Sequence, residues 1–185
     1  MSKRAGTFVT LRDLVDQVGS DVTRFVMLTR KNDAPLDFDF DKVLEQSRDN
    51  PVYYVQYASA RIHSVFRKAD EAGITFDKKL AMNEQFETVT HEAEIKIAKK
   101  LAEWPRLVEI AAKTNEPHRI AFYLYELAGD FHSLWNKGNE ISELRFIQEN
   151  NHRASCIKMA MISAVLVVIS SGLDILGVEP ATHMN

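Results

Sequence analysis

The sequence contains a single cysteine among 185 residues, Cys156, and this scarcity excludes a framework of intrachain disulfides. One thiol also fits a reducing compartment. Neither G-x-x-x-x-G-K-[ST] nor G-x-G-x-x-G occurs, so no glycine-rich loop of the phosphate-cradling kind is present. The histidines show no metal-ligand spacing with Cys156, and no Ser/His/Asp arrangement is legible. Disulfide scaffolds, structural metal sites and triad hydrolases are therefore not expected.

The chain also lacks a strong excess of positive charge. Its formal net charge is -3 and its pI is about 6.1, which argues against nucleic-acid binding through a uniformly basic surface. A local basic or aromatic site remains compatible with this balance. The N-terminus is too basic and too poor in apolar residues for a signal peptide, so we expect a cytoplasmic location.

The longest uncharged apolar stretch runs from Met159 to Leu173. It is shorter than the roughly 20 residues that cross a bilayer. We therefore expect a fully buried helix of a bundle and no contact with a membrane.

Helical periodicity dominates from about residue 41 onward. Asn50-Pro51 is a strong helix start, because asparagine caps and proline fits the first turn. Glu116-Pro117 predicts another start, and Trp104-Pro105 predicts a break that leaves a shorter helix over 106–113. The last long helix is expected from about residue 151 to 171, with Gly172 as its stop. Three other helices are expected to turn one set of apolar residues inward. The helix after Pro51 would use Val55, Ile62, Phe66 and Ala69. A helix that ends at Trp104 would use Phe86, Val89, Ala93, Ile97 and Leu101, and the helix after Pro117 would use Ile120, Leu124, Leu127, Phe131 and Trp135.

Residues 1–47 differ in texture from the remainder. A β-prone segment over 7–10 precedes a T-x-x-D capping box at Thr10 and Asp13. A second short helix follows Gly19, and residues 36–40 alternate apolar and acidic side chains as a half-exposed strand does. The predicted architecture is all-α, with a helical bundle over 48–185 that follows a small α/β connecting segment over 1–47.

One helix carries a candidate binding stripe. Tyr54, Tyr57 and Arg61 recur at spacings of three and four, so they share one face of the helix that begins at Pro51. Aromatic rings stack on unpaired bases, and arginine pairs with phosphates or base edges, so the stripe suits an RNA loop. The residues alone leave open a second interpretation, in which the tyrosines pack at the core edge and Arg61 forms a salt bridge.

Several blocks in order resemble arginyl-tRNA synthetase, a class I enzyme. Residues 1–6, MSKRAG, resemble its KMSKS-type loop without the leading lysine. The most specific block is NPVYYVQYASARI at 50–62. The blocks YLYELA with FH at 123–132 and GLDILGV at 172–178 complete the match, which covers nearly the whole chain.

The resemblance implies a domain that grips the tRNA anticodon loop within an arginine–tRNA ligase. In that enzyme a separate Rossmann-type domain activates arginine with ATP and magnesium. Lys3, in the loop with Met1, Ser2 and Arg4, would stabilise pyrophosphate. The anticodon contacts would be Tyr54, Tyr57, Arg61, Tyr123 and Met184.

The expected partners are an arginine-accepting tRNA and the catalytic domain, with no DNA. We expect this chain alone neither to activate arginine nor to charge tRNA. The family typically ends in P-E-R-M, whereas here Pro180-Ala181-Thr182-His183 precedes Met184. Tyr123 has an alternative role in ordinary packing with a satisfied hydroxyl. The bundle of another class I synthetase and a helical protein–protein interaction module stay open as alternatives.

Overall fold

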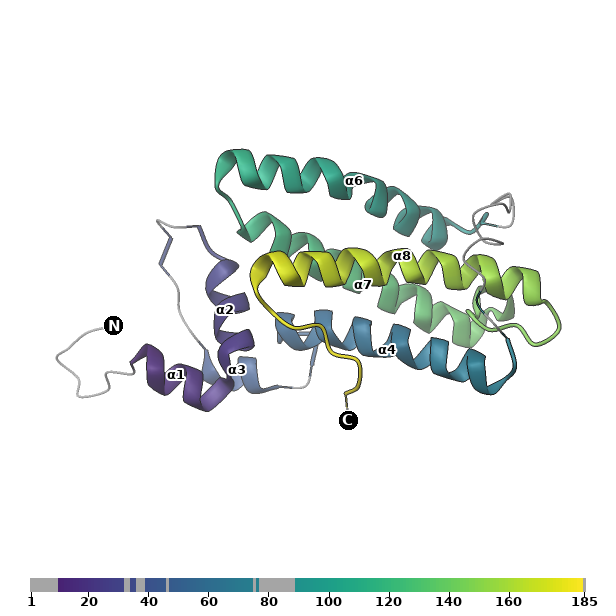
Figure 1. The fold of residues 1–185 in the computed structure, drawn as a ribbon, viewed down its shortest axis with the longest axis horizontal. Coiled ribbons are helices and arrows are strands. Elements are labelled where there is room, and N and C mark those ends of the chain that lie inside the picture. The colour runs from purple at the N-terminus through teal and green to yellow at the C-terminus, as the bar shows by residue number, and fades with distance from the viewer. Residues whose placement is uncertain are drawn as a thin grey trace.

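The computed structural model describes residues 10–31, 34–35, 39–45, 47–74, 76 and 89–184, and these contain helices without a strand (Figure 1). The short elements are α1 (Leu11–Val18), α2 (Ser20–Leu28), α3 (Phe40–Leu44) and the 3-10 helix η3 (Ser142–Leu144). The long elements are α4 (Pro51–Glu71), α6 (Glu92–Thr114), α7 (His118–Glu140) and α8 (His152–Leu176). The all-α prediction is confirmed for this part of the chain.

The long helices form a bundle in which α7 contacts α4, α6 and α8. In Figure 1 they lie lengthwise beside one another, with α1, α2 and α3 gathered at one end. The core draws on all four long helices and on α2. Its fully buried side chains include Phe25, Ile62, Ile97, Leu124, Leu127, Phe131, Ile162 and Ile169.

Local signals place the helix starts as the sequence predicts. Thr10 and Asp13 form a reciprocal capping box at α1. Asn50 caps α4 by accepting from the Tyr53 backbone N–H at 3.1 Å. Its amide also donates to the carbonyls of Val43 and Glu45 at 2.7 and 3.0 Å, so one buried side chain ties α3 to the start of α4.

The predicted break at Pro105 is wrong, because this proline lies inside α6, which has 23 residues in all. Proline removes the hydrogen bond to the carbonyl four residues earlier. Packing against α7 compensates, since the Trp104 and Tyr123 rings lie 5.3 Å apart and the Tyr123 hydroxyl donates to the Lys100 carbonyl at 2.5 Å. The helix begins at Glu92, so Val89 precedes it; Phe86 lies outside the described residues.

The predicted stop at Gly172 is also wrong. α8 continues to Leu176, and Gly177 caps it with a φ of 66°. A β-carbon at Gly172 would lie 2.6 Å from a methyl carbon of Leu124, so this glycine permits close packing of α8 against α7. Tertiary contact, rather than helix termination, explains its place in the sequence.

The predicted connecting segment is helical where it is described. Residues 7–9 and 36–38 lie outside the described residues, and Asp39 caps α3, whose first residue is Phe40. The strand predicted over 36–40 is therefore wrong at Phe40. Competition from the Asp39 side chain explains this, because it accepts from the Lys42 backbone N–H at 3.3 Å and so starts a helix.

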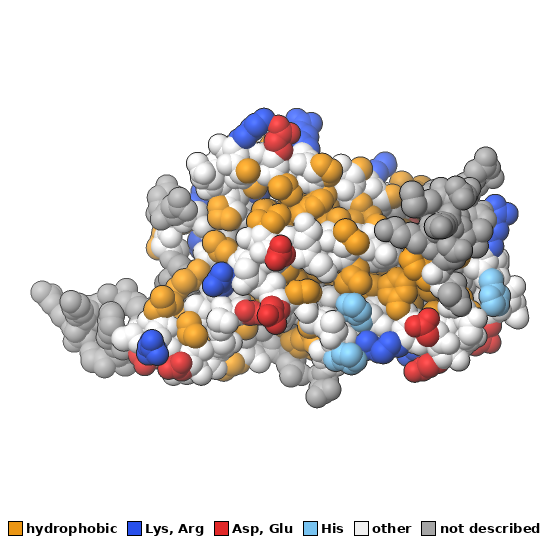
Figure 2. All heavy atoms as spheres, viewed as in Figure 1, with side chains coloured by type: hydrophobic (Ala, Val, Ile, Leu, Met, Phe, Trp, Pro, Cys, Tyr) orange, Lys and Arg blue, Asp and Glu red, His pale blue; other side chains and the backbone are white. Residues whose placement is uncertain are grey.

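The apolar stretch belongs to α8, which has 25 residues and is long and apolar enough to cross a membrane. Half of its most apolar window is buried inside the protein, and the helix packs on α4, α6 and α7. Met159 and Leu173 are fully buried, whereas Val167 is 64% exposed. Figure 2 shows hydrophobic side chains reaching the surface over this part of the bundle. The prediction of a core helix is therefore confirmed for one face only.

Candidate RNA-binding site

The tyrosine stripe of α4 lies over the seam between α4 and α7. Tyr54, Tyr57 and Arg61 are each half-buried, so their side chains are neither deep in the core nor free in solvent. The ring of His132, which comes from α7, lies 4.5 Å from the Tyr54 ring and 5.6 Å from the Tyr57 ring. Both tyrosines therefore contact the same imidazole, which agrees with the predicted position of Tyr54 and Tyr57 on one face of α4.

Arg61 sits within this group of rings without forming an ion pair to any described residue. Its guanidinium carbon lies 4.2 Å from the centre of the Tyr57 ring and 5.0 Å from that of Trp135. Its Nη1 lies 3.1 Å from His132 Nδ1. The salt-bridge alternative for Arg61 is thus not realised among the described residues, and cation–π contact holds the group in place.

The C-terminal segment leaves the end of α8 and runs across α4 (Figure 1), and its last described residues lie beside Tyr57 and Arg61. The Glu179 backbone N–H donates to Asp21 at 3.1 Å, and the Glu179 carbonyl accepts from Gln56 at 3.0 Å. Arg67 then donates to the Thr182 carbonyl at 3.3 Å. These contacts bring Met184 to the same depression as Arg61, although well over 100 residues separate the two in sequence.

We call this depression of about 320 Å³ the tail pocket. Its lining includes two aromatic rings and three cationic side chains, and the described residues contribute no carboxylate to it. A polar pocket of this composition matches an unpaired nucleotide, which offers a flat base and an anionic phosphate. The lining residues are Tyr57, Ala60, Arg61, Ser64, Arg67, Lys68, Trp135, His183 and Met184.

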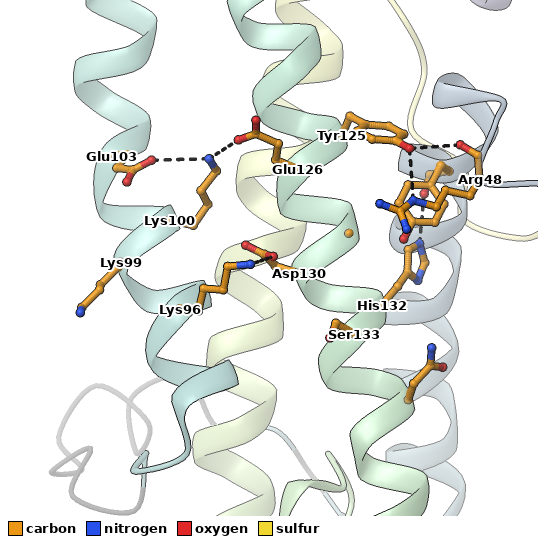
Figure 3. A pocket seen from close by; sticks show the side chains of 13 residues that line it. Arg48, Lys96, Lys99, Lys100, Glu103, Tyr125, Glu126, Asp130, His132 and Ser133 are labelled. Carbon is orange, nitrogen blue, oxygen red and sulfur yellow. Dashed lines mark hydrogen bonds and ion pairs between the residues drawn. The ribbon is translucent and has the colours of Figure 1, made fainter.

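A larger depression of about 760 Å³, which we call the α6–α7 cleft, has Tyr54 and His132 among its lining residues (Figure 3). Two of its three lysines form ion pairs with carboxylates. Lys96 pairs with Asp130 at 2.6 Å, and Lys100 lies 2.5 Å from Glu126 and 3.6 Å from Glu103. Because these charges are compensated locally, the cleft offers an anionic ligand less than its size suggests.

Tyr123 does not join the stripe. It is 3% exposed, and its hydroxyl donates to the Lys100 carbonyl beneath the Trp104 ring. Burial raises the pKa of this hydroxyl, and nearby Glu103 raises it further. The structure therefore favours the packing interpretation of Tyr123 over the predicted contact with RNA, because no ring face is open to a base.

His132 is buried, with 4% of its surface exposed, and it contacts both tyrosines and Arg61. Burial lowers its pKa to about 4, and the Arg61 charge acts in the same direction. The imidazole is consequently neutral at pH 7. The sequence predicts that Trp135 faces inward, and it assigns neither Trp135 nor His132 to the site. Their i, i+3 spacing on α7 is the only local signal that they share a site.

The catalytic prediction lies outside this part of the structure. Met1, Ser2, Lys3 and Arg4 are not among the described residues. Within the described ranges, no group of three or more His, Cys, Asp or Glu side chains could hold a metal ion.

The sequence profile of the DALR anticodon binding domain matches residues 55–184. The chain belongs to this family. The match includes both α4 after its first turn and the C-terminal residues that meet at the tail pocket. It also includes the whole of α6, α7 and α8.

Similar proteins are named arginine–tRNA ligase. Those from Ruegeria pomeroyi and Roseobacter denitrificans are 70% and 64% identical over 185 residues, which is all of this chain and 32% of each relative. The chain thus spans about a third of the length of the curated relatives that it matches. These comparisons confirm the resemblance to arginyl-tRNA synthetase.

Solved structures agree on the fold. An arginyl-tRNA synthetase from Campylobacter jejuni superimposes with a TM-score of 0.81 at 28% identity, over 99% of this chain and 37% of that one. The Thermus thermophilus arginyl-tRNA synthetase gives a TM-score of 0.63 at 21% identity over 98% and 29% of the two chains, which supports the fold alone.

Proposed function

We propose that the tail pocket and the adjoining α4–α7 seam bind the anticodon loop of an arginine-accepting tRNA. One observation carries this proposal. Two aromatic rings, three cations and Met184 converge on one depression whose described lining residues include no carboxylate. The chain carries a net charge of -3, so this local concentration of positive charge stands out against an acidic background.

Each group has a role that its chemistry suits. Tyr57 and Trp135 would stack on splayed bases, and Arg61 would donate to a base edge or phosphate. Arg67 and Lys68 are exposed at the rim and would meet the phosphate backbone. Tyr54 faces the α6–α7 cleft, where it would border the path of the loop.

The reaction served by this recognition is the ATP-dependent attachment of arginine to its tRNA. The names of the relatives and the MSKR motif at residues 1–4 support this assignment. Lys3 would neutralise pyrophosphate during formation of the adenylate. ATP, magnesium and arginine would bind in a catalytic domain, and the cytoplasm would be the site of action.

Replacing Tyr57 by alanine tests the proposal. Titration with an anticodon stem-loop RNA that carries an arginine anticodon, at one fixed salt concentration, should show a loss of about 1–3 kcal/mol in binding. Phe122→Ala is the matched control, because Phe122 is a half-exposed ring on α7 that does not line the tail pocket. Equal affinities for the wild-type chain and the Tyr57 variant would refute this use of the ring.

The same titration separates the alternatives. A stem-loop with the middle anticodon base changed should compete poorly if the chain recognises arginine tRNAs. The bundle of another class I synthetase would prefer a different anticodon. A helical protein–protein interaction module would bind none of these RNAs.

A further inference from the structure

We propose that His132 is a positioning residue that fixes the Arg61 guanidinium for a nucleotide in the tail pocket; this inference rests on the function proposed above. His132 lies between α7 and α4, and its two ring nitrogens have different partners. Nδ1 lies 3.1 Å from Arg61 Nη1, and Nε2 lies 3.1 Å from the Tyr54 carbonyl oxygen. Figure 3 shows the imidazole reaching from α7 toward this carbonyl.

The partners determine where the proton of the imidazole resides. A guanidinium can only donate, so Nδ1 must accept and carries no hydrogen. A carbonyl oxygen can only accept, so Nε2 must carry the hydrogen. His132 is therefore held as the neutral Nε2–H tautomer, and the α4 backbone fixes the orientation of its ring.

This arrangement leaves most of the Arg61 donors for a ligand. Arginine has five N–H groups, and His132 is the single hydrogen-bond partner of Arg61 among the described residues. Contact with the Tyr57 and Trp135 rings restricts the plane of the guanidinium, and the bond from His132 restricts its rotation within that plane. A guanidinium held in this way loses less conformational freedom on binding a base or a phosphate than an unrestrained one does.

Among the described residues, no carboxylate forms a hydrogen bond or an ion pair with the imidazole. From α4 the facing groups are the Arg61 guanidinium and the Tyr54 and Tyr57 phenols. The cleft beyond Tyr54 holds Arg48 from the preceding loop and the Lys96–Asp130 pair of α6 and α7. Protonation of His132 would remove the acceptor for Arg61 and place a second positive charge beside it.

Two substitutions separate positioning from simple packing. In His132→Leu the side chain fills space without an acceptor, whereas in His132→Asn the amide oxygen can occupy the place of Nδ1. We expect His132→Leu to weaken binding of the arginine anticodon stem-loop about tenfold, and His132→Asn to restore most of that loss. Thermal unfolding of both variants, measured in parallel, identifies any loss that comes from misfolding.

A double-mutant cycle with Arg61→Ala gives the decisive readout. If His132 acts through Arg61, His132→Leu should have no further effect on RNA affinity in the Arg61→Ala chain. An equal loss in both backgrounds, or unchanged affinity in His132→Leu alone, would overturn the inference. If instead Arg61→Ala itself binds RNA as well as the wild-type chain, the proposed function fails as well, so the two failures are distinguishable.

The RNA-free chain provides an independent test. Nitrogen-15 NMR of the His132 ring at neutral pH should show an unprotonated Nδ1 and a protonated Nε2, and the Arg61 guanidinium signals should sharpen relative to those in His132→Leu. The opposite tautomer would overturn the inference whatever the RNA titrations show.

Discussion

The two sides of α7 carry similar numbers of cations, but they compensate them differently. On the α6 side Lys96 and Lys100 face carboxylates. On the α4 side Arg61 and Arg67 contact rings, an imidazole or a carbonyl instead. The larger depression lies on the compensated side and the smaller one on the uncompensated side. We therefore place the proposed nucleotide site where cations lack a local anion and lie beside aromatic rings, rather than in the larger depression.

Two tyrosines that the sequence placed in one set illustrate the same difference. Tyr57 is half-buried and lies under the Arg61 guanidinium at the tail pocket. Tyr123 is buried against Trp104, and its hydroxyl is already used by a carbonyl of α6. The α4 side is therefore the one that remains available to a ligand.

The largest expected effect is on stability and belongs to the compensated side. Lys158 of α8 pairs with Glu94 of α6 at 2.5 Å, and both are buried. Lys158→Met would leave a buried carboxylate without a partner, so we expect a loss of about 3–5 kcal/mol in the free energy of unfolding, measured by urea denaturation at pH 7. The double variant with Glu94→Leu should regain most of it. If the single variant were as stable as wild type, the pair would not be compensating a buried charge.

The next largest effect is a pH dependence of stability, which arises from His132 on the α4 side of α7. The pKa of His132 is lowered to about 4 by burial, against about 6.5 in an unfolded chain. Its contribution to stability is therefore complete above pH 6.5. As pH falls from 6.5 toward 4, the imidazole becomes protonated in the unfolded state but stays neutral in the folded state. The free energy of unfolding therefore drops by on the order of 1 kcal/mol per pH unit.

Comparison with His132→Asn isolates this contribution. The variant has no titrating group at residue 132, so its stability should decline less between pH 6.5 and 4 than that of the wild-type chain. Identical slopes for the two chains would contradict the assigned burial of the neutral imidazole.

The smallest effect compares one exposed lysine from each side. Lys68 lines the tail pocket and Lys99 lines the α6–α7 cleft. If Lys68 meets a phosphate, Lys68→Ala should reduce the slope of log affinity against log salt by roughly 0.7, the value for one phosphate contact on a single strand. Lys99→Ala should leave the slope unchanged. A reversed result would move the RNA path to the cleft.

Local chemistry made part of this fold predictable. The capping box at Thr10 and the start at Asn50-Pro51 depend on neighbouring residues, and both are found as predicted. The predictions at Pro105 and Gly172 are wrong because packing against α7 overrides the helix-breaking tendency of both residues. In each case the deciding contact comes from another helix, which a local pattern does not contain.

The site was predictable to the same limited extent. Helical spacing placed Tyr54, Tyr57 and Arg61 on one face, and the structure confirms that grouping. The convergence with Trp135 and with the C-terminal segment required the bundle itself, because contacts from α2 and α4 carry that segment to the tail pocket. Burial favours packing for Tyr123, whose position on its helix was compatible with either packing or contact with RNA.

Methyl NMR of the methionines tests the central claim most directly. Met184 lines the tail pocket, Met27 is 42% exposed on α2, and Met159 is fully buried in the core. On addition of the arginine anticodon stem-loop to the chain labelled at its methionine methyl groups, the Met184 signal should shift while those of Met27 and Met159 stay in place. A shift of Met27 with Met184 unmoved would place the RNA elsewhere and contradict the account.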